Sequence, residues 1–221
     1  MTQQVPEIIK AERDLTGLTA ITFKGDPENI IKAFSDIRAG ISWPVRALPG
    51  YLCILGLLSG AQVGQEGPLM LIYEREYLTS NELMSDAYNR ANDLRFHRFY
   101  SDLKASEWQG FNFEFQRKVR HGLGARDIRL EHSYLAHDFG FGLHTIKRLS
   151  LARAFILPQT GILIEQLRQM TPDNLETDRP EYKFAAVNAF RFVVVAFDKF
   201  KNPVGKTQGT QEREISVKEW A

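Results

Sequence analysis

Two glutamates stand two residues apart at the end of a segment that has the pattern of a β-strand. The run Leu69–Tyr73 is apolar, and Glu74, Arg75 and Glu76 follow it directly. Side chains two apart on a strand share one face, so Glu74 and Glu76 have the spacing of paired ligands for a divalent metal. The same pattern also fits the solvent side of an edge strand, with Arg75 on the opposite face.

A second group of potential ligands lies between residues 132 and 144. Its members are His132, His137, Asp138 and His144. Imidazole and carboxylate groups together can bind zinc or another transition metal, but this spacing matches no zinc motif such as His-Glu-x-x-His. Gly140 and Gly142 break the chain here, and no third glycine follows to form a phosphate loop. Surface or capping positions are the alternative interpretation.

Basic residues gather in two places and indicate contact with a phosphate backbone. The larger group consists of Arg117, Lys118, Arg120, Arg126 and Arg129. The second run contains Lys147 and Arg148, and it would strengthen this interpretation if both groups lay on one face. A solvated helix end, whose cations complement the helix dipole, is the alternative.

The composition bounds the class of protein. The chain has 221 residues, of which 43% are hydrophobic and 25% charged, with a formal net charge of +1. Such a chain can bury a core, and any nucleic-acid contact would need a local basic patch. Cys53, the one cysteine, is expected to be a small buried hydrophobe. No secretory signal and no apolar run of membrane-spanning length are seen, so we expect a cytoplasmic protein.

The first 44 residues have the pattern of a separate N-terminal extension. Leu18–Phe23 is rich in β-formers, and the pattern of Pro27–Ile37, with Asp26 as N-cap, predicts a short helix that Gly40 closes. The extension either adds a layer to the main domain or binds a partner. Residues 201–221 are polar and are predicted to be a loose C-terminal tail.

Residues 45–200 alternate between strand and helix patterns. Strands are predicted at Tyr51–Leu58, Pro68–Tyr77, Phe96–Leu103 and Ile128–Ala136, the first two as an antiparallel hairpin. Helices are predicted after the capping box of Thr79 and Glu82, and at Trp108–Val119, Leu143–Phe155, Thr160–Met170 and Glu181–Phe200. The sequence therefore predicts an α/β fold with a mixed sheet flanked by helices.

This order of elements resembles the ribonuclease H-like fold. The last third, with TGILIEQLRQM at residues 160–170, a polar loop, and VNAFRF at residues 187–192, is similar to the end of the nuclease domain of phage terminase large subunits. That family cleaves DNA with two divalent metals held by carboxylates on the first strand, at the end of the fourth strand in fold order and on the last helix. The resemblance implies Mg²⁺ or Mn²⁺ as cofactor, double-stranded DNA and other phage packaging proteins as partners, and the host cytoplasm as location.

The sequence departs from the acids of this family. Tyr51–Leu58, taken as the first strand, has no carboxylate, and Val187 and Asn188 stand where the last helix would carry its aspartate. Asp102, at the end of its strand, matches the second acid and is the candidate catalytic residue and metal ligand. We therefore expect a catalytically degenerate domain that acts as a nucleic-acid-binding or assembly module in phage DNA packaging. The alternative is an active metal-dependent endonuclease that adds displaced acids, with Glu74, Glu76 and Asp138 as metal ligands.

Overall fold

A computed structural model of the protein describes residues 8–13, 19–23, 31, 34–58, 69–101, 129–132, 139–151, 154–158, 160–170 and 183–201. Its strands are β1 (Ile8–Arg13), β2 (Thr19–Phe23), β3 (Phe34–Ser42), β4 (Gly50–Leu58), β5 (Leu69–Tyr77), β6 (Arg98–Ser101), β7 (Arg129–His132) and β8 (Phe155–Ile156). Its helices are α2 (Ser80–Asp93), α4 (Phe139–Leu151), α5 (Ile162–Arg168) and α8 (Ala185–Lys201).

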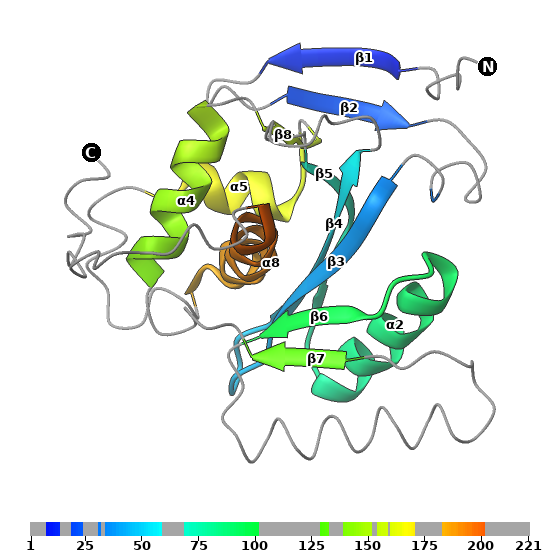
Figure 1. The fold of residues 1–221 in the computed structure, drawn as a ribbon. Helices are drawn as coiled ribbons and strands as arrows, with labels where there is room; N and C mark the ends of the chain where they lie inside the picture. Colours follow the sequence, from blue (N-terminus) through cyan, green and yellow to red (C-terminus); the bar gives the residue numbers. More distant parts are fainter. Residues whose placement is uncertain are drawn as a thin grey trace, which may run out of the picture.

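The strands of these segments form one mixed sheet (Figure 1), in the order β1-β2-β8-β5-β4-β3-β6-β7. At its centre β4 runs antiparallel to both β3 and β5, whereas β6 runs parallel to β3 and β7 parallel to β6. The strands β3, β4 and β5 therefore form an antiparallel meander, and β6 is added in parallel beside β3 and β7 beside β6. The predicted mixed sheet and the predicted hairpin of β4 and β5 are confirmed.

Helices cover both faces of the sheet (Figure 1). On one face α2 packs over β3, β4 and β5, and its Leu83, Ala87 and Ala91 are buried there. On the other face α4, α5 and α8 share a core with the opposite side chains of β4 and β5. The apolar helix α8 lies against β3 and β4, and burial of each large side chain stabilises the fold by about 1.5–3 kcal/mol.

Thr79 and Glu82, the pair predicted to begin α2, contact each other as the N-cap requires. Thr79 is the N-cap residue, and its hydroxyl accepts a hydrogen bond from the backbone N–H of Glu82 at 3.3 Å. The hydroxyl also contacts the Glu82 carboxylate at 3.0 Å. These local contacts fix where the helix begins, and they explain why the sequence located it.

The predicted helix Pro27–Ile37 is wrong over its last turn, because β3 begins at Phe34. Ile37, Ala39 and Ile41 alternate toward the core under α2, which is the period of a strand. Gly40 does not close a helix: a Cβ there would come 1.9 Å from the carbonyl oxygen of Ala189. Glycine at this position lets α8 cross β3 at close range.

β3 is a central strand, although the sequence placed its residues in the extension of residues 1–44. It pairs with β4 on one side and with β6 on the other. The division of the chain at residue 44 stays a prediction, but the sheet itself includes residues that precede it. Consequently the first strand of the five central strands is β3 and not Tyr51–Leu58.

Two further boundaries differ from the sequence analysis. Gly140 and Gly142 do not break the chain but lie in the first turn of α4, which begins at Phe139. The predicted helix Leu143–Phe155 ends at Leu151, and Phe155 instead forms the short strand β8. The predicted helix Trp108–Val119 lies outside the described residues.

Candidate functional site: a polar cluster where β3, β6 and α8 meet

The carboxyl ends of β3 and β6 lie side by side, and α8 crosses them. The register pairs Ile41 with Ser101, so β3 and β6 end on the same edge of the sheet. Gly40 brings the backbone of α8 against this end of β3, as its contact with Ala189 shows. The end of the first strand, the end of the strand beside it and the last helix are therefore close together, as a site with ligands on these three elements requires.

Ser42, Asn188 and Arg191 form the buried polar cluster at this meeting point. The Asn188 amide donates a hydrogen bond from Nδ2 to the hydroxyl oxygen of Ser42 at 3.1 Å, and Nε of Arg191 donates one to Oδ1 of Asn188 at 2.7 Å. The three residues are at most 2% exposed. Both ends of the Asn188 amide are thus used, which fixes its orientation.

The Arg191 guanidinium is a buried positive charge with an aromatic surrounding. Its carbon lies 5.0 Å from the ring centre of Phe139 and 4.5 Å from that of Phe192. Gly142 makes room for its stem, because a Cβ at Gly142 would lie 2.9 Å from Cδ of Arg191. Aromatic faces and amide oxygens offset part of the desolvation cost of a buried cation.

The donors of this cluster do not fit a divalent metal. Mg²⁺ and Mn²⁺ need several oxygen ligands, with carboxylates among them to balance the charge. The cluster offers one hydroxyl and one amide oxygen, and that amide oxygen already binds a guanidinium. Across the described residues, no group of three or more histidine, cysteine, aspartate or glutamate side chains could hold a metal ion.

The acids predicted as ligands are not gathered at this cluster by the described structure. Asp102, which directly follows Ser101 in the chain, and Asp138 both lie outside the described residues. The carboxylate that β3 does carry, Asp36, is near the other end of the strand and pairs with Arg38 at 2.5 Å.

The contacts of Glu74 link elements of the fold to one another. Its Oε2 accepts a hydrogen bond from the Tyr51 hydroxyl and another, at 3.1 Å, from the backbone N–H of Leu163 at the start of α5. Gly161, with φ of +145°, leaves space for this carboxylate, because a Cβ there would lie 2.0 Å from Oε1 of Glu74. Burial, and then the neighbouring Glu74 charge, raise the pKa of Tyr51 far above its ordinary value. Glu74 thus joins β5, β4 and α5.

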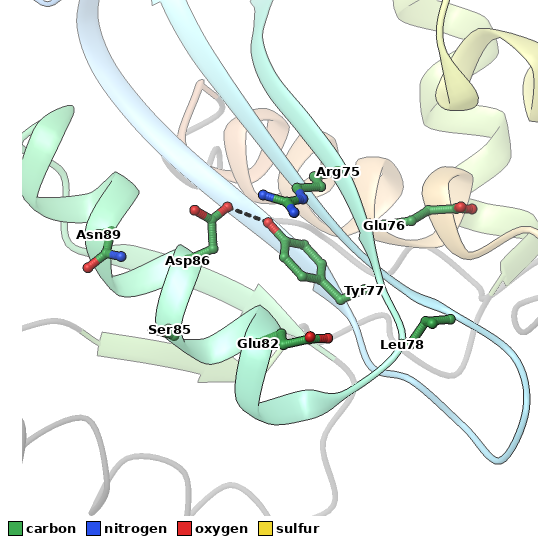
Figure 2. Close-up of a pocket in the computed structure, with 8 residues that line it drawn as sticks. All are labelled: Arg75, Glu76, Tyr77, Leu78, Glu82, Ser85, Asp86 and Asn89. Atoms are coloured by element: carbon green, nitrogen blue, oxygen red, sulfur yellow. Dashed lines mark hydrogen bonds between the residues drawn. The ribbon is translucent and has the colours of Figure 1, made fainter.

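A second polar group lies between β5 and α2, and two of its members, Tyr77 and Asp86, line a hollow in the surface (Figure 2). The Asp86 carboxylate accepts hydrogen bonds from the hydroxyls of Tyr73, at 2.7 Å, and Tyr77, and lies 3.5 Å from Nε of Arg90. Burial and the bond to Asp86 raise the pKa of Tyr77 well above its ordinary value. Glu76, two residues after Glu74, points away from Asp86 in Figure 2. The contacts of Asp86 are those of a link between helix and sheet.

The described residues include only some of the basic residues predicted to bind nucleic acid. Arg117, Lys118, Arg120 and Arg126 lie outside the described residues, and Arg129 begins β7. Lys147 and Arg148 lie in α4, where Lys147 is half-buried and Arg148 exposed. Their joint role in binding nucleic acid stays a prediction. None of the helices in the described segments is long and apolar enough to cross a membrane.

The solved structures that this fold resembles include nuclease domains of viral large terminases. Against solved structures, it matches the large terminase of a thermophilic bacteriophage with a TM-score of 0.50 and 12% identity, over 73% of this chain and 40% of that one. The nuclease domain of the large terminase from bacteriophage SPP1, with bound Mn, gives 0.46 and 14%, over 76% and 89%. The fowlpox virus Holliday junction resolvase gives 0.41 and 8%, over 74% and 99%.

The match with a TM-score of 0.50 and the observed sheet topology together establish the fold. The chain has the ribonuclease H-like fold, a mixed sheet flanked by helices, as the sequence predicted. Its structural neighbours are nuclease domains of terminase large subunits, and the chain spans 40% of the length of the large terminase that it matches. No family model and no curated protein matches the sequence.

Of the three residues in the polar cluster, the sequence pattern indicated one, Asn188. Asn188 was recognised as the departure from the aspartate of the last helix. Ser42 was missed because the first strand was taken to be residues 51–58. Arg191, one helical turn after Asn188, has no predicted role; its i, i+3 spacing from Asn188 is the signal that could have found it.

Proposed function

We propose that this chain is a terminase nuclease-like domain that has lost metal-dependent cleavage and serves as a DNA-binding module in phage DNA packaging. The observation that carries the loss of cleavage is the Ser42–Asn188–Arg191 cluster. Neutral side chains, Ser42 at the carboxyl end of β3 and Asn188 in α8, stand where the terminase family would carry carboxylates. The Arg191 guanidinium adds a positive charge beside them. A guanidinium in this position repels a second cation and neutralises any nearby acid.

DNA as partner rests on two supports of different kinds. The first is the fold, which the chain shares with part of a large terminase. The second is the sequence, which has basic residues grouped near residues 117–129 and in α4 while the net charge of the chain is only +1. A domain with this charge distribution binds a phosphate backbone through a local patch and not through its overall charge.

Incubation with plasmid DNA and Mn²⁺ tests the loss of cleavage, with Asp102→Ala as the control. We expect no metal-dependent cleavage from either protein. Cleavage by the wild-type chain that Asp102→Ala abolishes would establish the alternative, an active endonuclease with displaced acids. Cleavage that is equal in both would point to a contaminating nuclease, so the assay is repeated until that activity is removed.

A salt titration of DNA affinity tests the binding role. Because bound cations release condensed counterions, log K should fall linearly with log salt concentration, with a slope of about −0.9 for each phosphate contacted. A response that does not depend on salt would remove DNA as the partner. The remaining role would then be assembly with other packaging proteins.

A further inference from the structure

The turn between β3 and β4 follows Ser42 directly and lies beside the ends of β6 and β7 (Figure 1). Its two-residue tip, Arg46 and Ala47, is closed by a pair of backbone hydrogen bonds between Val45 and Leu48, of 3.1 and 3.0 Å. Arg46, Ala47 and Leu48 are exposed, and Leu48 has 45% of its surface accessible.

The backbone of Arg46 is in a conformation that arginine disfavours. Its φ is +56°, in the left-handed region, while Ala47 has a negative φ. In a two-residue hairpin loop, positive φ at the first central residue only is the pattern of a type II′ turn, where glycine is the usual residue. The positive φ alone does not single out Arg46, because Arg95 has a φ of +55°; what distinguishes Arg46 is its place in a turn at the edge where β3 and β6 end.

The base of the turn is rigid. Trp43 donates a hydrogen bond from Nε1 to the hydroxyl oxygen of Ser101 at 2.5 Å, which ties the turn to the end of β6. Pro44 lies against Gly50, since a Cβ at Gly50 would be 2.4 Å from Cδ of Pro44. The tip is therefore held in one place relative to the polar cluster, and binding there needs little further ordering of the backbone.

The side chains of the tip suit a nucleic-acid backbone. Within the part of the chain that the structure describes, the Arg46 guanidinium has no ion pair or hydrogen bond. A guanidinium binds phosphate oxygens, and an exposed aliphatic side chain two residues away can pack on the sugars that lie between phosphates. This combination stands at the edge where the fold brings its first strand and last helix together.

We propose that the β3–β4 turn is a rigid DNA contact, in which Arg46 binds a backbone phosphate of duplex DNA and Leu48 packs on the adjoining sugar. This inference rests on the proposed DNA-binding function and locates part of the DNA contact on the β3–β4 turn. It predicts that the domain holds a duplex across the edge formed by the ends of β3, β6 and β7, with the polar cluster beneath.

The test measures binding of a short fluorescently labelled duplex to the full chain by anisotropy, over a series of potassium chloride concentrations. Arg46→Gly removes the charge and also relieves the unfavourable φ, so this variant should unfold at the same temperature as the wild-type chain or higher. Its salt slope should nevertheless be smaller by about 0.9, the loss of one phosphate contact. Arg46→Lys, which keeps the charge, should retain the wild-type slope.

The chain offers a matched control in Arg95. This residue is also exposed and has a φ of +55°, but it follows the C-terminal end of α2. Arg95→Gly should leave both affinity and salt slope unchanged. Leu48→Ser should weaken binding at every salt concentration without changing the slope, because an apolar contact releases no counterions.

The outcomes separate this inference from the proposed function. If the wild-type chain binds the duplex and Arg46→Gly binds with an unchanged slope, the turn is not the contact and the inference is wrong. An equal loss of slope in Arg95→Gly would show a general effect of net charge and would also overturn it. If the wild-type chain does not bind the duplex, the proposed DNA-binding function fails, and this inference fails with it.

Discussion

Returning acids to the polar cluster should not restore a metal site while Arg191 remains. The double variant Ser42→Asp/Asn188→Asp places carboxylates at the end of β3 and in α8. Nε of Arg191 lies 2.7 Å from Oδ1 of Asn188, so an aspartate at position 188 would pair with the guanidinium. The carboxylate intended for the metal would already have a cation.

The magnitude follows from Coulomb's law. A divalent ion bound about 2.1 Å from a carboxylate oxygen that also holds the guanidinium would lie about 5 Å from the guanidinium charge. At an effective dielectric constant of about 20, this repulsion is about 7 kcal/mol. Since 1.4 kcal/mol is a factor of ten, metal affinity should be lower by about five orders of magnitude than in a site without the arginine.

The assay is Mn²⁺ titration by calorimetry, together with the shift of the unfolding temperature in Mn²⁺. We expect no measurable binding by the wild-type chain or the double variant, and binding only when Arg191→Gln is added to the double variant. The triple variant should be less stable without metal, because two buried carboxylates would then lack a partner, and Mn²⁺ should recover the loss.

Two results would refute this reasoning. Tight Mn²⁺ binding by the wild-type chain that Asn188→Ala removes would show that the neutral cluster holds a metal. Tight binding by the double variant equal to that of the triple variant would show that Arg191 does not oppose the metal. Because Ser42 is 2% exposed, a variant at this position can fail to fold; Asn188→Asp with and without Arg191→Gln then provides the same comparison.

Three other predictions concern the packing around the site. The pKa values of Tyr51 and Tyr77 are raised in the folded chain, so the unfolded chain loses these two phenol protons at lower pH. The free energy of unfolding should therefore fall as pH rises above about 10, and denaturant midpoints that are constant between about pH 9 and 11 would contradict this. Glu74→Ala should destabilise the fold by about 2–4 kcal/mol, because the Tyr51 hydroxyl and the first turn of α5 lose their hydrogen-bond acceptor. If Mn²⁺ raised the unfolding temperature of the wild-type chain but not of this variant, Glu74 would instead be a metal ligand. Gly142→Ala should lower stability by about 1–3 kcal/mol by pressing α4 on Arg191, although alanine is the better helix former; a higher unfolding temperature would reject this contact.

The elements that the sequence located correctly are those determined by their own residues. The strand of residues 50–58 is a continuous apolar run, and α2 begins at an N-cap threonine and buries side chains at helical spacing. These patterns need no knowledge of the remaining chain. The mixed sheet followed because an antiparallel hairpin and later alternating elements can form few other arrangements.

β3 was missed because its identity depends on distant partners. Ile30, Ile31 and Phe34 have helical spacing, and only the pairing of β3 with β4 and β6 makes residues 34–42 a strand. For the same reason, the sequence pattern assigned the position of the family's first acid to Tyr51–Leu58 and not to β3. Gly40 and Gly142 were likewise interpreted as breaks, whereas each allows a close approach to α8, and that approach exists only in the folded chain.

If the chain has lost metal-dependent cleavage, as proposed, the cluster also explains how the fold is stable without bound metals. In a two-metal nuclease, the ions neutralise carboxylates that would otherwise repel one another at a buried sheet edge. A chain that keeps the acids and loses the ions would be destabilised, and so would one that removes the acids but leaves a polar cavity. Here Asn188 bonds Ser42 on one side and Arg191 on the other, and Gly142 allows the arginine stem to fill the space beneath α4. Asn188 and Arg191 depend on each other: Asn188→Ala would leave the Nε of a buried guanidinium without its Asn188 acceptor, at a cost of about 1–3 kcal/mol, and Arg191→Leu should largely remove that penalty. If the two changes instead add independently, Arg191 does not depend on Asn188, and the cluster is not a unit.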